Sequence, residues 1–213
     1  MNIIILGPQG SGKGTQAELL AKKYNLEHFD TGKSLRQVAL LDTSLGKEIH
    51  EIIMVRKELV PSRILREILH LELNSLPREQ GIVFDGIPRN AEQAEYFDAA
   101  LQEFGRKVDK VFFIKLSEEE AIGRISKRWV CRKCKNNLIM GKDIHSEGEK
   151  CPQCGGEVVQ REDDSPSGVR KRLAIFQEDT MPVIEKYKEK GLVVEISGAQ
   201  PIEKVLADIE KNL

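Results

Sequence analysis

Residues 7–16 read Gly-Pro-Gln-Gly-Ser-Gly-Lys-Gly-Thr-Gln and follow directly on the apolar run Asn2–Leu6. Glycines let a backbone adopt conformations that a Cβ forbids, so successive N–H groups can point at one anion. The N-terminus of the following helix and the mobile charge of Lys13 would add to that attraction. The run therefore predicts a buried strand that ends in a phosphate-binding loop. A plain glycine-rich turn is the alternative, which the preceding strand and the lysine disfavour.

The loop departs from the general motif at one position. Its spacing fits G-x-x-x-x-G-K, but Gly14 stands where the usual pattern has Ser or Thr. Thr15 is then the nearest hydroxyl for a phosphate or a magnesium-bound water. Taken alone, the loop predicts that the protein binds a chain of phosphates, but it does not predict which reaction follows.

Length and charge narrow the function class. The chain has 213 residues, with 33 Lys and Arg against 34 Asp and Glu. That length fits one domain with an insertion, and the balanced charge gives no sign of a nucleic-acid partner. No apolar run approaches the roughly 18 residues that span a bilayer, and the N-terminus lacks the basic start of a signal peptide. We therefore expect a cytoplasmic protein with no membrane partner.

Apolar β-branched runs alternate with helical patterns along the chain. Strands are expected at Asn2–Leu6, His28–Phe29, Ile82–Phe84, Lys110–Lys115 and Val193–Ile196. Helices are expected at Gly14–Tyr24, Thr31–Leu40, Leu45–Val55, Pro61–Leu73, Ala91–Phe104, Ser117–Lys127, Ser167–Lys188 and Pro201–Asn212. Such alternation predicts an α/β fold with a parallel sheet covered on both faces.

Three features punctuate this alternation. The Met181-Pro182 pair should kink or break the helix expected over residues 167–188. The segment 30–60 carries no strand. Residues 128–165 are poor in long apolar side chains and rich in Cys, Gly, Lys and Asn, which indicates an inserted module.

All four cysteines lie in that module. Cys131-x2-Cys134 and Cys151-x2-Cys154, separated by 16 residues, predict two knuckles with four thiolates at the corners of a tetrahedron. We predict a structural zinc, with iron as the alternative because it accepts the same ligands. Coincidental thiols or a redox pair remain a weaker reading. His145, between the knuckles, is interpreted as a solvated loop residue rather than a substitute ligand.

Three further patches carry ligand-binding chemistry. Asp30-Thr31-Gly32-Lys33-Ser34-Leu35-Arg36 follows a short strand and opens a helix, and Phe84-Asp85-Gly86-Ile87-Pro88-Arg89 follows another strand. The carboxyl ends of parallel strands form the ligand crevice of open α/β sheets. The third patch is a set of arginines: Arg124, Arg128, Arg161, Arg170 and Arg172. Arg124 and Arg128 are expected on one helix face. For any one arginine, a surface ion pair is the alternative.

In this order, the pieces resemble the adenylate kinase family, specifically its long form with a metal-binding lid. The resemblance covers essentially the whole chain. It rests on the glycine-rich loop, Asp30-Thr31-Gly32 with Leu35-Arg36, Asp85-Gly86-Ile87-Pro88-Arg89 with Gln93, Arg124 with Arg128, the four cysteines, Arg161 with Asp163-Asp164, and Val169-Arg170-Lys171-Arg172-Leu173.

The resemblance implies a P-loop NTPase-type parallel five-stranded sheet flanked by helices, with an inserted metal-binding lid. The implied core comprises residues 1–29, 61–127 and 166–213. Residues 30–60 would bind a nucleoside monophosphate, and residues 128–165 would form the lid. The implied reaction is reversible Mg2+-dependent phosphoryl transfer from ATP to AMP, giving two ADP in adenine nucleotide homeostasis. The family is commonly monomeric.

The resemblance also implies residue roles by matched position. The ATP-binding residues would be Gly10, Ser11, Gly12, Lys13, Gly14, Thr15, Arg124, Arg128 and Gln200. The AMP-binding residues would be Thr31, Arg36, Glu58, Leu59, Val60, Gly86, Arg89, Gln93, Arg161 and Arg172. Catalysis would fall to Lys13, Arg89, Arg124, Arg128, Arg161 and Arg172, with Asp85 contacting Mg2+ through water.

Physical chemistry agrees with such a site. The acceptor is a phosphate oxygen that is already anionic, so no general base is needed. The transition state spreads charge over equatorial oxygens, and positioning with charge stabilisation then supplies the catalysis.

Six positions, at four places in the chain, depart from the family pattern. Lys33 stands where the family usually has Asp, and Lys57-Glu58 replaces Gly-Lys. Asn137-Leu138 replaces a common Tyr-His pair, and Glu162 replaces a basic residue. The departures bear on metal handling and nucleotide preference, because none of them removes a phosphate clamp.

Two rival functions remain. Another P-loop kinase, acting on a different monophosphate, would differ around Thr31 and Gln93. A zinc-ribbon nucleic-acid-binding NTPase would use the basic residues Arg128, Arg132, Lys133 and Lys135 as its reader. The neutral net charge and the single aromatic residue of that ribbon, Trp129, disfavour the second rival.

Overall fold

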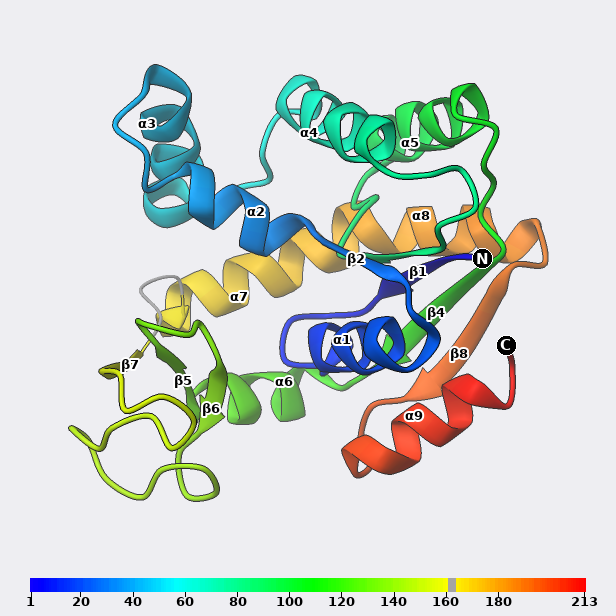
Figure 1. Ribbon diagram of the computed structural model, residues 1–213. Helices are drawn as coiled ribbons and strands as arrows, with labels where there is room; N and C mark the ends of the chain where they lie inside the picture. The colour runs from blue at the N-terminus through cyan, green and yellow to red at the C-terminus, as the bar shows by residue number, and fades with distance from the viewer. Residues whose placement is uncertain (161–163) are drawn as a thin grey trace.

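The computed structural model describes residues 1–160 and 164–213, and its centre is a five-stranded parallel sheet. The strands run in the order β2-β3-β1-β4-β8 (Figure 1). Their bounds are β1 Asn2–Leu6, β2 Glu27–Asp30, β3 Ile82–Asp85, β4 Lys110–Lys115 and β8 Val193–Ser197. The five strands expected from the sequence are confirmed, with small shifts at their ends.

Side chains of β1 pack into two hydrophobic cores, one on each face of the sheet. Ile3 and Ile5 pack into one hydrophobic cluster, whereas Ile4 and Leu6 pack into another. Successive side chains of a strand point to opposite faces, so a continuous apolar run is what a sheet covered on both sides requires.

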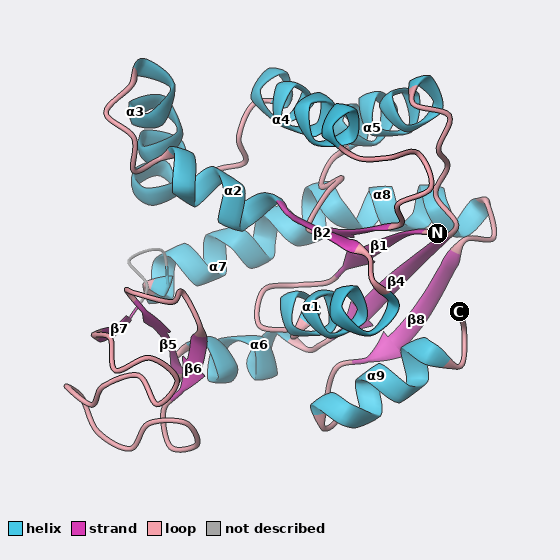
Figure 2. Cartoon of the chain, in the orientation of Figure 1, coloured by secondary structure: helices cyan, strands magenta, loops and turns pink. Residues whose placement is uncertain are grey.

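Helices cover both faces of the sheet (Figure 2). One face packs against α1 (Lys13–Tyr24) and α9 (Ile202–Glu210). The other packs against α4 (Ser62–Ser75), α5 (Ala91–Glu103) and α8 (Met181–Glu189). The α/β layering predicted from the sequence is therefore confirmed.

The segment 30–60 is helical. It contains α2 (Thr31–Val38), α3 (Ser44–His50) and a π-helical continuation, η1 (Glu51–Arg56). The expected single helix over residues 45–55 is thus half α and half π. Asp30 caps α2 by accepting a 2.8 Å hydrogen bond from the Lys33 N–H, and Thr43 caps α3 in the same way.

The long helix expected over residues 167–188 changes type rather than breaking. It consists of α7 (Pro166–Ile175), a π-helical stretch η3 (Phe176–Thr180) and α8. The π stretch ends directly before Met181-Pro182, where the proline lacks the N–H that an α-helix would use. The wider turn frees the Thr180 hydroxyl, which donates to the Arg89 carbonyl at 2.8 Å.

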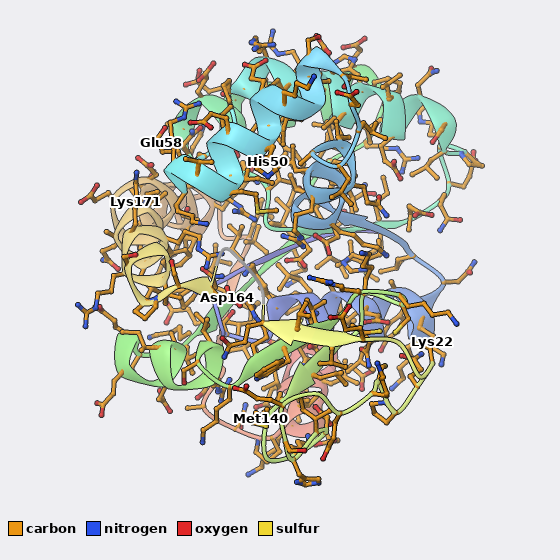
Figure 3. All side chains as sticks on the ribbon, turned by 90° about the vertical axis from the view of Figure 1, so that its left-hand side faces the viewer. Lys22, His50, Glu58, Met140, Asp164 and Lys171 are labelled. Atoms are coloured by element: carbon orange, nitrogen blue, oxygen red, sulfur yellow. The ribbon has the colours of Figure 1, made fainter. Side chains whose placement is uncertain are left out.

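Helix α7 also contacts the segment 30–60. The Lys171 ammonium donates to the Arg56 carbonyl at 2.7 Å and lies 3.3 Å from the Glu58 carboxylate (Figure 3). Both side chains are exposed, so this ion pair contributes about 1 kcal/mol or less.

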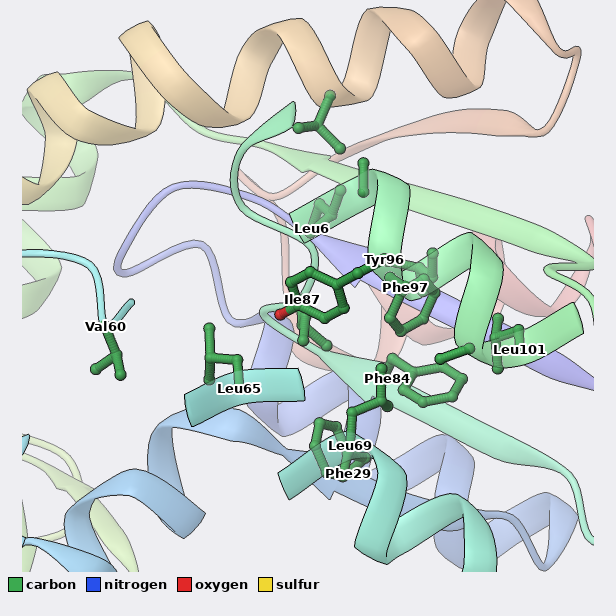
Figure 4. Packing of buried hydrophobic residues seen from close by; sticks show 14 of the residues in the cluster. Leu6, Phe29, Val60, Leu65, Leu69, Phe84, Ile87, Tyr96, Phe97 and Leu101 are labelled. Carbon is green, nitrogen blue, oxygen red and sulfur yellow. The ribbon is translucent and has the colours of Figure 1, made fainter. Parts of the chain in front are cut away.

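Aromatic rings fill the larger core. Phe84 of β3 meets Phe97 of α5 edge-on, with ring centroids 4.8 Å apart, and Phe29 of β2 at 5.9 Å (Figure 4). Leu65 and Leu69 of α4 extend the cluster towards Val60. This packing holds the carboxyl ends of β2 and β3 together.

The inserted module (residues 128–165) is a separate small layer. It follows α6 (Glu118–Ile125), whose N-terminus carries a capping box formed by Ser117 and Glu120. Its antiparallel sheet has the order β6-β5-β7, with β5 Arg128–Cys131, β6 Asn137–Ile139 and β7 Val158–Gln160. The sequence pattern gave no sign of these short strands.

No helix within residues 1–160 and 164–213 combines the length and apolarity that crossing a bilayer requires.

Candidate active site

The glycine-rich loop has the backbone geometry of an anion cradle. Gly10 and Gly12 adopt φ values of +83° and +88°, which side chains rarely tolerate. An ideal Cβ at Gly7 would lie 2.6 Å from the Ile114 carbonyl oxygen, so only glycine fits against β4 there. Helix α1 starts at Lys13 without a side-chain cap at Gly12. Its first N–H groups therefore stay available to an anion.

Gly14 is explained by the neighbouring strand. An ideal Cβ at this position would lie 3.0 Å from Asp85 Oδ2. A side chain here would require the Asp85 carboxylate to shift by a few tenths of an ångström, so Gly14 lets that carboxylate lie directly against the start of α1. Asp85 is only 6% exposed, and its Oδ1 has no hydrogen-bond partner in the described part of the chain.

Lys13 reaches the same region. Burial lowers its pKa to about 8; the nearby Asp85 carboxylate opposes the shift, whereas Arg89 and Arg128 reinforce it. Three cationic residues thus crowd one space, as a site built for several phosphates requires.

Arg128 and Arg172 converge on one carboxylate. Arg128 donates to Asp164 through Nε at 2.8 Å and Nη2 at 2.7 Å, and Arg172 Nη2 donates to it at 2.9 Å. Gln9 of the loop adds a fourth contact at 3.2 Å. The Asp164 side chain is 4% exposed. It occupies the arginines much as a phosphate oxygen would.

Arg124, in the last turn of α6, contacts a different part of the site. Its guanidinium donates to the Gly198 carbonyl at 2.8 Å and approaches the Gly10 carbonyl at 3.5 Å. The prediction that Arg124 and Arg128 share a helix face is wrong, because α6 ends at Ile125 and Arg128 begins β5. Gln200, on the same loop as Gly198, donates to Asp208 at 2.9 Å.

A small cavity of about 40 Å3 lies beside the segment 30–60. It brings together seven of the residues matched to AMP binding: Thr31, Glu58, Leu59, Val60, Gly86, Arg89 and Gln93. Thr31 is 2% exposed and Gln93 1%. Thr31 Oγ1 and Gln93 Nε2 nevertheless lack partners among the described residues, which costs roughly 1–3 kcal/mol each without a ligand.

Arg89 is held rigidly at the cavity wall. Its Nε donates to the Gly86 carbonyl at 2.5 Å, and its N–H donates to Gln93 Oε1 at 2.8 Å. Gly86 has φ +75°, and an ideal Cβ there would lie 2.6 Å from Arg89 Nη2. Burial lowers the pKa of Arg89, an effect that Asp85 and Asp30 oppose.

Two matched residues need separate mention. Arg36 folds back over the start of α2, where an ideal Cβ at Gly32 would lie 3.0 Å from its Nη1. Arg161 lies outside the described residues.

The four cysteines gather into one cluster, with sulfur atoms within 4.8 Å of one another. The two knuckles share a hydrogen-bond pattern. Lys135 N–H donates to the Cys131 carbonyl and Gly155 N–H to that of Cys151. The equivalent residues Lys135 and Gly155 both adopt left-handed backbone conformations, with φ +61° and +68°. This conformation is unfavourable for the lysine of the first knuckle but not for the glycine of the second.

The sulfur cluster is suited to a metal. The Cys134 N–H points at the Cys131 sulfur and helps to lower the pKa of that thiol, which favours the ligating thiolate. An ideal Cβ at Gly156 would lie 2.8 Å from the Cys131 sulfur, so the backbone packs directly on the cluster. His145 is exposed and outside the cluster, as expected.

Sequence reasoning missed three side chains of the site. The acidic run 163–164 was noticed, but nothing in it indicated that Asp164 neutralises two arginines. Thr180 contacts Arg89 only because of the π turn. His28 comes within 3.8 Å of Asp85 through the pairing of β2 with β3.

Sequence comparison decides the family. A profile of adenylate kinases matches residues 5–192. The chain belongs to the adenylate kinase family. It is 39% identical over 213 residues to the adenylate kinase of Archaeoglobus fulgidus, which covers 100% of this chain and 98% of that protein. Identity to the adenylate kinase of Dehalococcoides mccartyi strain 195 is 41% over 204 residues, or 96% of this chain and 94% of that protein. As an adenylate kinase family member, the chain is an ATP:AMP phosphotransferase, a nucleoside monophosphate kinase.

Proposed function

We propose that the chain transfers a phosphoryl group reversibly from ATP, with Mg2+, to AMP, and so maintains the balance of adenine nucleotides. The observation that carries the proposal is the buried acceptor cavity. It lines up two unpartnered polar atoms, Thr31 Oγ1 and Gln93 Nε2, beside the cationic Arg89.

The geometry of Gln93 supports adenine as the acceptor base. Because the Arg89 N–H can only donate, the Gln93 oxygen faces it, and the amide nitrogen is the free group. A free donor suits the ring-nitrogen acceptors of adenine. The N1–H of guanine would meet it donor to donor, which leaves a buried group unpaired.

The donor side rests on the glycine-rich loop. Its N–H groups, the α1 N-terminus and Lys13 would hold the phosphates of ATP. Arg124, whose guanidinium lies near the Gly10 carbonyl of the loop, would join in holding these phosphates, and the backbone at Gln200, which follows β8, would face the adenine. Arg128 and Arg172 would exchange Asp164 for the transferred phosphate, with Arg161 as a further clamp.

The reaction needs charge rather than a base. The attacking oxygen of AMP is anionic, so no side chain has to remove a proton. Lys13, Arg89 and the arginine pair would neutralise charge on the equatorial oxygens as the bond to ADP breaks.

The small volume of the acceptor cavity supports movement of the segment 30–60 on AMP binding. At about 40 Å3 it falls far below the roughly 300 Å3 of small ligand pockets. AMP binding would therefore require the segment 30–60 to move away from the core. Closure of that segment and of the module 128–165 would exclude water and prevent hydrolysis of ATP.

Two metals belong to this proposal. Asp85 would contact the Mg2+ of ATP through water, which its buried and unpartnered Oδ1 supports. Zinc, with iron as the alternative, would be bound by the four cysteines and stabilise a module that has little hydrophobic core of its own. All four ligand positions come from protein, which supports a structural metal. Elemental analysis should find about one zinc per chain.

The cellular setting is also proposed. Unpaired, metal-suited cysteines support a reducing cytoplasm. We propose a monomer with ATP and AMP as its partners, without nucleic acid or membrane.

A nucleotide panel tests the function. The protein is incubated with MgATP and each of AMP, GMP, CMP and UMP, and ADP formation is followed. AMP should be the preferred acceptor by at least tenfold. A preference for UMP or CMP would contradict the proposal.

A matched pair of variants tests the acceptor site. Gln93→Leu should lower kcat/KM for AMP by about 10–100-fold, since it removes one donor and unpairs the Arg89 N–H. Gln102→Leu, an exposed position on the same helix, should leave it unchanged. Equal effects of both variants would show that Gln93 has no special role.

A further inference from the structure

Three metal-ligating side chains converge at the carboxyl ends of two neighbouring strands. His28 and Asp30 are two residues apart on β2, so they share one face, and Asp30 pairs in register with Asp85 on β3. One ligand atom from each side chain lies within 4.8 Å of the other two. This spacing fits a single cation between them.

Two of the three side chains have a buried polar atom without a partner among the described residues. Asp85 Oδ1 is buried with no hydrogen bond, and His28 Nε2 is likewise unpartnered among the described residues. The nearest approach, from His28 Nε2 to Asp85 Oδ2, is 3.8 Å and too long for a hydrogen bond. A buried carboxylate oxygen without a partner is costly, and a bound cation would remove that cost.

The arrangement is tied to the phosphate site. Asp85 Oδ2 lies beside Gly14, at the start of α1. Both Asp85 and Asp30 also lie near enough to Lys13 and Arg89 to influence their charges. A cation among these carboxylates would therefore lie between the donor loop and the acceptor cavity.

The donor set selects among divalent cations. Mg2+ prefers oxygen ligands and dehydrates reluctantly, whereas an imidazole nitrogen with two carboxylates suits Mn2+, Fe2+ or Co2+. Asp30 Oδ1 accepts a hydrogen bond from the Lys33 N–H, and the other carboxylate oxygen of Asp30 can still serve a metal.

We propose that His28, Asp30 and Asp85 bind a divalent cation directly, and that this site prefers Mn2+ or Co2+ to Mg2+. The proposal deepens the proposed function, on which it rests for the role of the cation, but the binding itself requires no nucleotide.

The test is a Mn2+ titration of the zinc-loaded, nucleotide-free protein, followed by the electron paramagnetic resonance of free Mn2+. One Mn2+ should bind per chain, and Mg2+ should displace it only at a concentration at least about tenfold higher. Asp30→Ser keeps a good helix cap and removes the carboxylate, and His28→Gln removes the imidazole. Each should weaken Mn2+ binding by about tenfold or more.

Matched controls use exposed residues of the same types. Asp42→Ser and His70→Gln should leave Mn2+ affinity unchanged. The proposal is overturned if the wild type binds no Mn2+ without nucleotide. It is also overturned if Asp85→Asn alone abolishes binding while Asp30→Ser and His28→Gln bind as tightly as the wild type. In either case, retained AMP preference with MgATP would leave the proposed function intact.

Discussion

Raising the pH should weaken ATP binding through a single residue, Lys13. Burial lowers the pKa of Lys13 from 10.5 to about 8. Phosphates favour the charged form of Lys13, so its pKa rises again when ATP binds, and at alkaline pH Lys13 takes up a proton on binding. The charged fraction of Lys13 falls about 25-fold between pH 7.5 and 9.5 for a pKa of about 8. ATP affinity should fall by up to that factor, or about 2 kcal/mol.

The assay is calorimetric titration of ATP, without AMP, at half-unit steps of pH. Repeating it at pH 9 in two buffers of different ionisation enthalpy counts the protons taken up. Lys13→Met should bind ATP weakly and with a flat pH profile. Lys22→Met, an exposed position on the same helix, should keep the wild-type profile.

The loss of ATP affinity at high pH cannot be explained by Lys13 destabilising the folded protein. The unfolded chain binds more protons at Lys13 than the folded chain does between pH 8 and 10.5, so this residue adds stability as the pH rises through that window. The reasoning is refuted if wild-type affinity stays within twofold from pH 7.5 to 9.5. It is equally refuted if Lys13→Met shows the same slope.

Three further predictions follow from the packing. Gly156→Ala should lower the stability of the inserted module by about 1–3 kcal/mol, because the added Cβ would overlap the Cys131 sulfur. Zinc should then be released faster to a coloured chelator. Gly123→Ala, where a Cβ meets no atom within 4 Å, is the control, and equal zinc-release rates of the two variants would contradict the prediction. Arg124→Met should lower kcat/KM for ATP by about 100–1,000-fold in steady-state assays, on the scale of losing one oxyanion donor, and a loss below tenfold would remove Arg124 from the site. A double-mutant cycle of Lys171→Met and Glu58→Gln, measured on KM for AMP, should give a coupling energy between the two residues of about 1 kcal/mol or less. A larger coupling energy would contradict the weak contribution expected of this exposed ion pair.

The sheet could be predicted because its signal is local. The inner strands β1, β3 and β4 carry continuous apolar runs, as a strand buried on both faces of a sheet requires, whereas the edge strands β2 and β8 mix apolar and polar residues and are only partly buried. Thr31, Arg89 and Gln93, which the resemblance matches to AMP binding, were picked out through motifs, and all three line one cavity.

The rest depends on distant contacts. The strands of the inserted module, β6 and β7, have three residues each, too few for a period to emerge. The π turn at Phe176–Thr180 has no propensity signal, since it reflects the demands of Pro182 and of the Arg89 carbonyl. Arg128 does not share a helix face with Arg124 because α6 ends at Ile125 and the chain continues into β5 at Arg128. Asp164 and His28 join the site through tertiary pairing, which spacing along the chain does not reveal.

The close approach of Gly14 to Asp85 has an evolutionary consequence. An ideal Cβ at position 14 would lie 3.0 Å from Asp85 Oδ2, so a side chain there and the acid on β3 would have to adjust to each other by a few tenths of an ångström. Changes at positions 14 and 85 are therefore expected to be coupled. The order in which substitutions arise at the two positions would then matter, because each alters the room available to the other.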